Sequence, residues 1–126
     1  MLLAEDDADQ REALAMVLEH RGYDVTAVGD GRAAIAAMAA VDAADFRFAV
    51  LDVKMPVMDG LEAAAQIRRS WPWMRIVFQT AMEEDWVRER FGDYDAYFRK
   101  PLDIDLFLRR LDTLLPERDE ALQSRR

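Results

Sequence analysis

The sequence contains no cysteine, a single histidine and no apolar run near the length of a membrane-spanning helix. Without cysteine there can be no disulfide, no thiolate metal site and no thiol nucleophile. A helix needs about 20 apolar residues in a row to cross a bilayer, and no signal peptide is visible at the start of the chain. We therefore expect a cytoplasmic protein that makes no membrane contact.

Basic residues are also in short supply, with 17 Lys and Arg against 25 Asp and Glu, for a formal net charge of -8. Because proteins hold nucleic acid mainly through cationic contacts to phosphate, this balance argues against direct nucleic-acid binding. An acidic surface suits a Mg²⁺ site or a basic partner, and it also simply keeps a protein soluble. With 126 residues, 52% of them hydrophobic, the chain is expected to form one globular domain.

The most informative stretch is an unbroken apolar run, residues 48–51, which ends in a single acid, Asp52. A run without alternation is typical of a strand buried on both faces, as in a parallel sheet covered by helices. Asp52 would then lie at the carboxyl end of the strand, where open α/β sheets place their ligand sites. Pro56 and the pair Asp59-Gly60 mark the loop that follows. Since burying a carboxylate that has no function is energetically unfavourable, we interpret Asp52 as the functional residue of the chain.

Short apolar strands alternate with helical patterns along the whole chain. We expect strands over residues 1–4, 23–28, 46–51, 75–79 and 96–99, and helices over residues 7–21, 32–40, 61–69, 83–91 and 103–115. Gly22 is expected to close the first helix and Pro116 to stop the last. The pattern predicts an α/β domain over residues 1–115, built on a doubly wound, five-stranded parallel sheet, with 116–126 as a polar tail or linker.

Polar side chains follow four of the expected strands: Glu5 and Asp6, then Asp52, Thr80 and Lys100. At neighbouring strand ends they would be spaced by about 4.8 Å per strand and line one pocket. Carboxylates that converge repel one another unless a cation binds, and oxygen donors without His or Cys favour Mg²⁺ over zinc. A carboxylate beside a hydroxyl and an ammonium can accept a phosphoryl group, with Asp52 attacking phosphorus.

Four motifs occur in order between Leu2 and Leu115. They are Glu5-Asp6-Asp7, Leu51-Asp52-Val53-Lys54-Met55-Pro56 with Met58-Asp59-Gly60, Thr80-Ala81, and Tyr97-Phe98-Arg99-Lys100-Pro101. Together they resemble the receiver domain of two-component response regulators. The resemblance implies the flavodoxin-like (βα)5 fold of chemotaxis regulators, with strand order 2-1-3-4-5.

The resemblance also implies a role for each matching residue of the pocket. Asp52 matches the phospho-acceptor, Asp6 the main Mg²⁺ ligand and Glu5 a second acid that acts through water. Lys54 matches the position whose backbone carbonyl completes the metal sphere. Asp7 is interpreted as a helix cap, and Asp59 with Gly60 as loop and helix-start residues without a catalytic role.

The remaining matches concern the product and the switch. Lys100 matches the lysine that pairs with the phosphoryl oxygens, and Pro101 a proline that is cis in the family. Thr80 matches the hydroxyl that turns toward the phosphoryl group. Tyr97 matches the aromatic residue that rotates inward behind it, with a fixed core position as the alternative. His20 ends the first helix and is expected on the surface, not as a phosphodonor.

The function implied is a signalling receiver that takes a phosphoryl group from a histidine kinase or phosphotransfer protein onto Asp52 with Mg²⁺ and then switches conformation. It would not be an enzyme, beyond assisting its own phosphorylation and slow dephosphorylation. One alternative is a non-switching pseudo-receiver that only binds proteins. Another is a phosphohydrolase with an aspartyl nucleophile, but haloacid-dehalogenase-like enzymes carry a second acid where this chain has Lys54.

The chain departs from the family between Thr80 and Lys100, which are closer in sequence than is usual. A short or irregular fourth helix is expected, and Gly92-Asp93-Tyr94-Asp95-Ala96 replaces a familiar Gly-Ala. The face over residues 83–106, with Trp86 and Leu106, is a candidate contact for an output domain or protein partner, and a homodimer stays open. Since 116–126 is too short for a DNA-binding module, the chain is expected to be a stand-alone receiver or one excised from a longer protein.

Overall fold

A computed structural model describes residues 1–40 and 46–124, with residues 115–124 as backbone only. Strands and helices alternate throughout, as the sequence predicts. Their bounds are β1 Leu2–Ala4, α1 Ala8–His20, β2 Thr26–Val28, α2 Gly31–Ala39, β3 Phe48–Leu51, α3 Gly60–Ser70, β4 Arg75–Thr80, α4 Glu84–Arg90, β5 Ala96–Arg99 and α5 Ile104–Ser124. None of the helices in the described residues has both the length and the apolar character needed to cross a bilayer.

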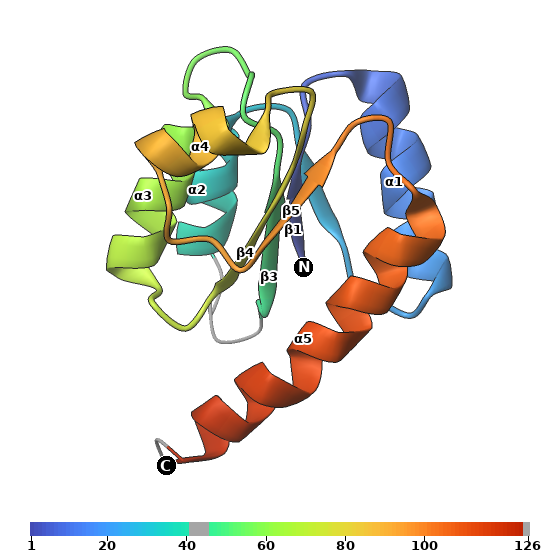
Figure 1. The fold of residues 1–126 in the computed structure, drawn as a ribbon, viewed down its shortest axis with the longest axis vertical. Coiled ribbons are helices and arrows are strands. Elements are labelled where there is room, and N and C mark those ends of the chain that lie inside the picture. Colours follow the sequence, from blue (N-terminus) through green and yellow to red (C-terminus); the bar gives the residue numbers. More distant parts are fainter. Residues whose placement is uncertain (41–45, 125–126) are drawn as a thin grey trace.

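The strands form one parallel sheet in the order β2-β1-β3-β4-β5, so the predicted fold class is confirmed. Figure 1 shows α1 and α5 against one face of the sheet and α2, α3 and α4 against the other. Right-handed crossovers produce this arrangement when successive strands are added in both directions from β1. The switch in direction lies between β1 and β3, which places their carboxyl ends side by side.

Two apolar cores, one on each face, explain the unbroken hydrophobic strands. Leu2 and Leu51 belong to the core under α2, α3 and α4, whereas Leu3 and Val50 belong to the core under α1 and α5. All four side chains are completely buried. Each such side chain stabilises the fold by roughly 1.5–3 kcal/mol, so both faces of the sheet hold the strand ends rigidly.

Aspartates start four of the helices in the described residues. The side chains of Asp7, Asp30, Asp59 and Asp103 each accept a hydrogen bond from the backbone N–H three residues further on, at 3.0, 2.7, 2.9 and 3.2 Å. Each cap is worth about 1 kcal/mol. Asp7 and Asp59 therefore have the capping role that the sequence predicts, and Gly22 follows α1 with a φ of +101°.

The second strand is shorter than predicted, beginning at Thr26 rather than Tyr23. Because β1 offers only Leu2–Ala4 for pairing, the residues before Thr26 have no partner strand to extend along. Tyr23 instead donates its hydroxyl to Asp112 Oδ1 at 3.0 Å, and its ring packs edge-on against Phe48. The side chain thus joins the sheet edge to α5.

The prediction that Pro116 stops the last helix is wrong, because the helical backbone of α5 continues to Ser124. A proline inside a helix lacks one N–H donor and costs about 3 kcal/mol, and the α5 backbone stays helical on both sides of Pro116 in spite of this cost. Figure 1 shows this end of α5 extending beyond the sheet. The boundary between a domain of 1–115 and a tail of 116–126 stays a prediction, and residues 125–126 lie outside the described part.

The fourth helix is short, as expected, and a charged cluster holds the loop after it. Asp95 accepts from Arg75 Nη1 at 2.8 Å, from the Ile76 N–H at 2.8 Å and from Arg68 Nη2 at 3.3 Å. The Asp95, Arg68 and Arg75 side chains are only 16–18% exposed. The loop is therefore tied to α3 and β4 at the end of the sheet away from Asp52.

We expect Asp95→Asn to lower the free energy of unfolding by about 2 kcal/mol, because two poorly hydrated guanidinium groups would lose their shared anion. Asp93→Asn is the matched control: Asp93 Oδ2 also contacts Arg68, but its side chain is 73% exposed, so a loss below about 0.5 kcal/mol is expected. Urea denaturation of both variants measures the difference. Equal losses would show that the cluster does not hold the loop.

Candidate functional site

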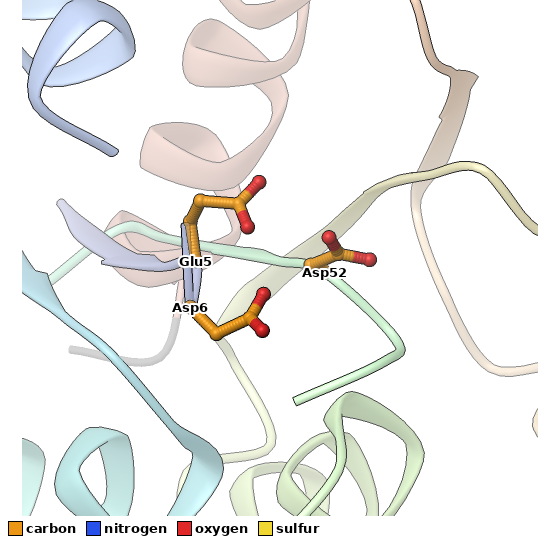
Figure 2. Close-up of side chains that lie close together, drawn as sticks. All are labelled: Glu5, Asp6 and Asp52. Atoms are coloured by element: carbon orange, nitrogen blue, oxygen red, sulfur yellow. The ribbon is translucent and has the colours of Figure 1, made fainter. Parts of the chain in front are cut away.

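Four neighbouring strand ends carry the predicted site residues. Glu5 and Asp6 follow β1, Asp52 follows β3, Thr80 ends β4 and Lys100 follows β5. Because β1, β3, β4 and β5 are adjacent and parallel, their carboxyl ends form one edge. The structure brings the side chains of Glu5, Asp6, Asp52 and Lys100 together there, with Thr80 at the adjacent strand end, and Figure 2 shows the three acids gathered at the ends of β1 and β3.

The three carboxylates form a compact oxygen cluster. Glu5, Asp6 and Asp52 each offer one oxygen within 4.8 Å of the others. Glu5 is 1% and Asp52 6% exposed, whereas Asp6 is open to solvent. Figure 2 shows Glu5 and Asp6 extending in different directions from consecutive residues. One acid thus points inward from β1 and the other lies at the accessible rim.

Lys100 is the cation of the site. Its Nζ donates to Glu5 Oε1 at 2.5 Å, to Asp52 Oδ2 at 2.7 Å and to Gln10 Oε1 at 2.8 Å. Burial lowers the pKa of Lys100, but the bonds to Asp52 and Glu5 outweigh it, so that the pKa is raised. Burial likewise opposes ionisation of Glu5, yet the Lys100 ammonium and other donors bring its pKa below the ordinary value. Both groups are charged at neutral pH.

Asp6 differs from Glu5 in having no ion-pair partner among the residues that the structure describes. Partial desolvation and the neighbouring Glu5 carboxylate raise the pKa of Asp6, and Asp52 adds to the effect. A divalent cation between Asp6 and Asp52 would relieve this repulsion. With oxygen ligands and no His or Cys in the cluster, the residues present fit Mg²⁺.

The loop after β3 forms one wall beside the acids. A hollow of about 550 Å³ is lined by Asp6, Val53, Lys54, Met55, Pro56, Asp59 and Trp86. Lys54 lies two residues after Asp52, and its side chain is exposed rather than filling the site. The Gly60 N–H donates to the Val53 carbonyl at 2.8 Å, which closes the loop and starts α3 directly behind Asp52.

Thr80 and Tyr97 meet at the backbone of Met82. The Met82 N–H donates to Thr80 Oγ1 at 3.3 Å, and the Tyr97 hydroxyl donates to the Met82 carbonyl. Thr80 is buried and Tyr97 half-buried. The two residues predicted to switch are therefore linked through one backbone unit at the end of β4.

Other predicted positions are placed as follows. The Lys100–Pro101 peptide bond is cis. His20 is exposed at the end of α1, and Leu106 is 53% exposed on α5. Trp86 is not a free surface group, because it packs against the core under α2–α4 and carries the Arg90 guanidinium 3.9 Å from its ring centre.

Sequence reasoning missed two glutamines that contact the site. Gln79 Nε2 donates to Glu5 Oε1 at 3.3 Å, and Gln10 accepts from Lys100. Gln10 gave no signal, because a glutamine on a helix is ordinarily a surface residue. Gln79 did give one, since it is a polar residue within the buried run of β4, immediately before Thr80.

The fold and the site define a class: a doubly wound α/β protein with an acidic, lysine-containing site at the carboxyl edge of its sheet. The family model described as response regulator receiver domain matches residues 1–112. The chain belongs to this family, and the resemblance seen in the sequence is confirmed. Receiver domains are signalling domains rather than classical enzymes.

Curated relatives are response regulators. The chain is 36% identical over 116 residues to the transcriptional regulatory protein TcrA of Mycobacterium tuberculosis, covering 90% of this chain and 45% of TcrA. It is 38% identical over 119 residues to the response regulator MprA of Mycolicibacterium vanbaalenii, and the match covers 91% of this chain and 49% of MprA. The chain thus spans about half the length of these relatives.

Solved structures agree on the fold. A CheY-like receiver domain protein from Methanospirillum hungatei superimposes with a TM-score of 0.87 at 23% identity, covering 95% of each chain. The response regulator protein TrrA of Thermotoga maritima was solved in complex with Mg²⁺ and BeF. It superimposes with a TM-score of 0.77 at 25% identity, covering 90% of this chain and 96% of TrrA.

Proposed function

We propose that this chain is a phosphorylation-dependent signalling receiver that accepts a phosphoryl group on Asp52 with the help of Mg²⁺. The observation that carries the proposal is the position of Asp52, buried at the carboxyl end of β3 with Lys100 Nζ at 2.7 Å and two further acids alongside. A carboxylate with one adjacent cation and room for a second is suited to a phosphoryl acceptor.

In the proposed reaction an Asp52 oxygen attacks the phosphorus of the donor. A new O–P bond forms while the bond from phosphorus to the donor breaks. The leaving group, a histidine imidazole or the acetate of acetyl phosphate, departs with the electron pair of that bond. Bound Mg²⁺ would neutralise charge at the phosphoryl oxygens. The residues that would hold the ion are Asp6 and Asp52, with the Lys54 carbonyl and, through water, Glu5.

Lys100 and Thr80 would hold the product. Lys100 already donates to Asp52, so a short movement brings its ammonium onto a phosphoryl oxygen. Thr80 ends the adjacent strand, and its hydroxyl at present accepts from the Met82 N–H. Turning that hydroxyl toward a phosphoryl group would break this hydrogen bond, which makes Met82 the first backbone unit to respond.

The response would then pass to Tyr97, because its hydroxyl holds the carbonyl of the same residue, Met82. Movement there reaches α4 and β5, whose face over residues 83–106 we propose as the contact for a downstream partner. Leu106 offers an exposed apolar group on this face. A homodimer through it is a further proposal.

Partners follow from the chemistry. A histidine kinase or phosphotransfer protein would supply the phosphoryl group. The named relatives are about twice as long as this chain, and TcrA is described as a transcriptional regulatory protein. We infer that the receiver controls an output domain or a separate protein, and that nucleic acid is not bound by residues 1–115 themselves, given the net charge of -8.

Reductive trapping tests the proposal. The protein is treated with acetyl phosphate and Mg²⁺, reduced with borohydride, and digested for peptide mapping. An acyl phosphate is reduced whereas a free carboxylate is not, so Asp52 should be the reduced position. Reduction at Asp6 or Asp59, with Asp52 intact, would overturn the assignment.

A further inference from the structure

Gln79 is a buried polar residue that the proposed phosphoryl transfer does not use. It lies on β4 between Phe78 and Thr80, is 1% exposed, and directs its amide at Glu5 Oε1. An apolar side chain in this place would avoid the desolvation of an amide, so the polar residue needs a reason. Within the described part of the chain, its side chain has one hydrogen-bond partner, and that partner is an acid of the candidate site.

The hydrogen bonds of Lys100 make the position of Gln79 significant. An ammonium has three N–H donors, and those of Lys100 go to Glu5, Asp52 and Gln10. To reach a phosphoryl oxygen on Asp52, Lys100 must therefore release one of these acceptors, and the release that concerns Gln79 is that of Glu5. Releasing Glu5 would leave a carboxylate that is almost completely buried without its cation.

Glu5 keeps two donors if Lys100 moves. The Asp7 N–H donates to Glu5 Oε2 at 3.2 Å, and Gln79 Nε2 donates to Oε1, the same oxygen that Lys100 contacts. Gln79 is thus the group that can stay on this oxygen after Lys100 leaves. Because it comes from the rigid, buried β4, it also fixes the direction in which the Glu5 carboxylate points.

We propose that Gln79 is a positioning residue, which holds Glu5 in place while Lys100 transfers from Glu5 to the phosphoryl group on Asp52. The inference rests on the proposed function and adds a step to it. Gln79 would act through Glu5 and Lys100, without touching the phosphoryl group. It makes the release of Lys100 easier, so its amide should matter for the rate of transfer more than for binding of the donor or the metal.

The kinetic test compares Gln79→Met with Gln66→Met. Methionine keeps the length of glutamine but removes the amide, and Gln66 is a partly buried glutamine on α3 outside the site. We expect Gln79→Met to lower the maximal rate of phosphorylation by acetyl phosphate about tenfold, because the variant loses one hydrogen bond to a charged group. The half-saturating acetyl phosphate concentration and the Mg²⁺ dissociation constant, measured calorimetrically with Mg²⁺ alone, should change less than about twofold.

A second measurement needs no substitution at Gln79. In wild-type protein labelled with ¹⁵N-glutamine, the side-chain amide resonance of Gln79 should shift when the aspartyl phosphate forms, while that of Gln66 stays in place. An unmoved Gln79 resonance, an unchanged maximal rate, or equal losses in rate and Mg²⁺ affinity would each overturn the positioning role. Intact mass of the same wild-type sample separates the two proposals: without an added phosphoryl group the proposed function itself fails, and this inference with it.

Discussion

Replacing Gly60 by alanine should destabilise the protein by at least ~3 kcal/mol and disturb Asp52 directly. A Cβ at residue 60 would lie 1.9 Å from the Asp52 carbonyl oxygen and 2.8 Å from its carbonyl carbon. Both are backbone atoms, so no flexible side chain can move aside. Either α3 must withdraw from the sheet, or the backbone that carries the Asp52 carboxylate must shift.

Urea denaturation and phosphorylation by acetyl phosphate measure the two consequences of Gly60→Ala. The matched control is Gly92→Ala, because its new Cβ would meet nothing closer than the Arg88 carbonyl at 3.4 Å. That variant should differ from wild type by less than about 1 kcal/mol. Similar stabilities for the two variants would contradict the close approach of α3 to Asp52.

Substituting Lys100 by methionine should slow phosphorylation of Asp52 by about 100-fold. In the unphosphorylated protein the ammonium forms ion pairs with Glu5 and Asp52 at 2.5 and 2.7 Å. During transfer it would stabilise charge that develops on the phosphoryl oxygens, a contribution that methionine cannot make. Arg99→Met removes the neighbouring but 58% exposed cation and should leave the rate within about twofold.

The stability of Lys100→Met should also depend more on Mg²⁺ than that of wild type. Without the ammonium, two buried carboxylates face each other and Asp6, and the fold should lose about 2 kcal/mol in metal-free buffer. A cation that binds only the folded state raises the melting temperature by mass action. We therefore expect a larger Mg²⁺-induced rise in melting temperature for Lys100→Met than for wild type. An equal rise would show that Lys100 and Mg²⁺ do not share these carboxylates.

The fold could be predicted from the sequence because its central strands are short, unbroken apolar runs and most of its helices start at aspartates. Residues 48–51 and Asp59 illustrate both signals, which act over a few neighbours. One error lies where residues far apart in the sequence determine whether a strand can pair. Tyr23 continues the strand pattern, but β1 is too short to pair with it. A second error has no such cause: Pro116 is a local stop signal, yet the helical backbone of α5 continues through it.

The candidate site was predictable in outline for a related reason. Parallel strands bring their carboxyl ends to one edge, so Asp52, Thr80 and Lys100 could be placed together from their order alone. What could not be predicted is which oxygen each donor contacts. The contact of Gln79 with Glu5 spans 74 positions in the chain, and the fit of Gly60 against Asp52 depends on how closely α3 packs.

Phosphorylation of Asp52 can be tested by intact-mass analysis of wild type and Asp52→Asn after incubation with acetyl phosphate. We expect one added phosphoryl group on the wild type when Mg²⁺ is present, none without Mg²⁺, and none on Asp52→Asn under either condition. A folded wild type that gains no mass, or an Asp52→Asn variant that gains the same mass, would contradict this expectation. The first of these results would favour a receiver fold that serves only as a protein-binding module.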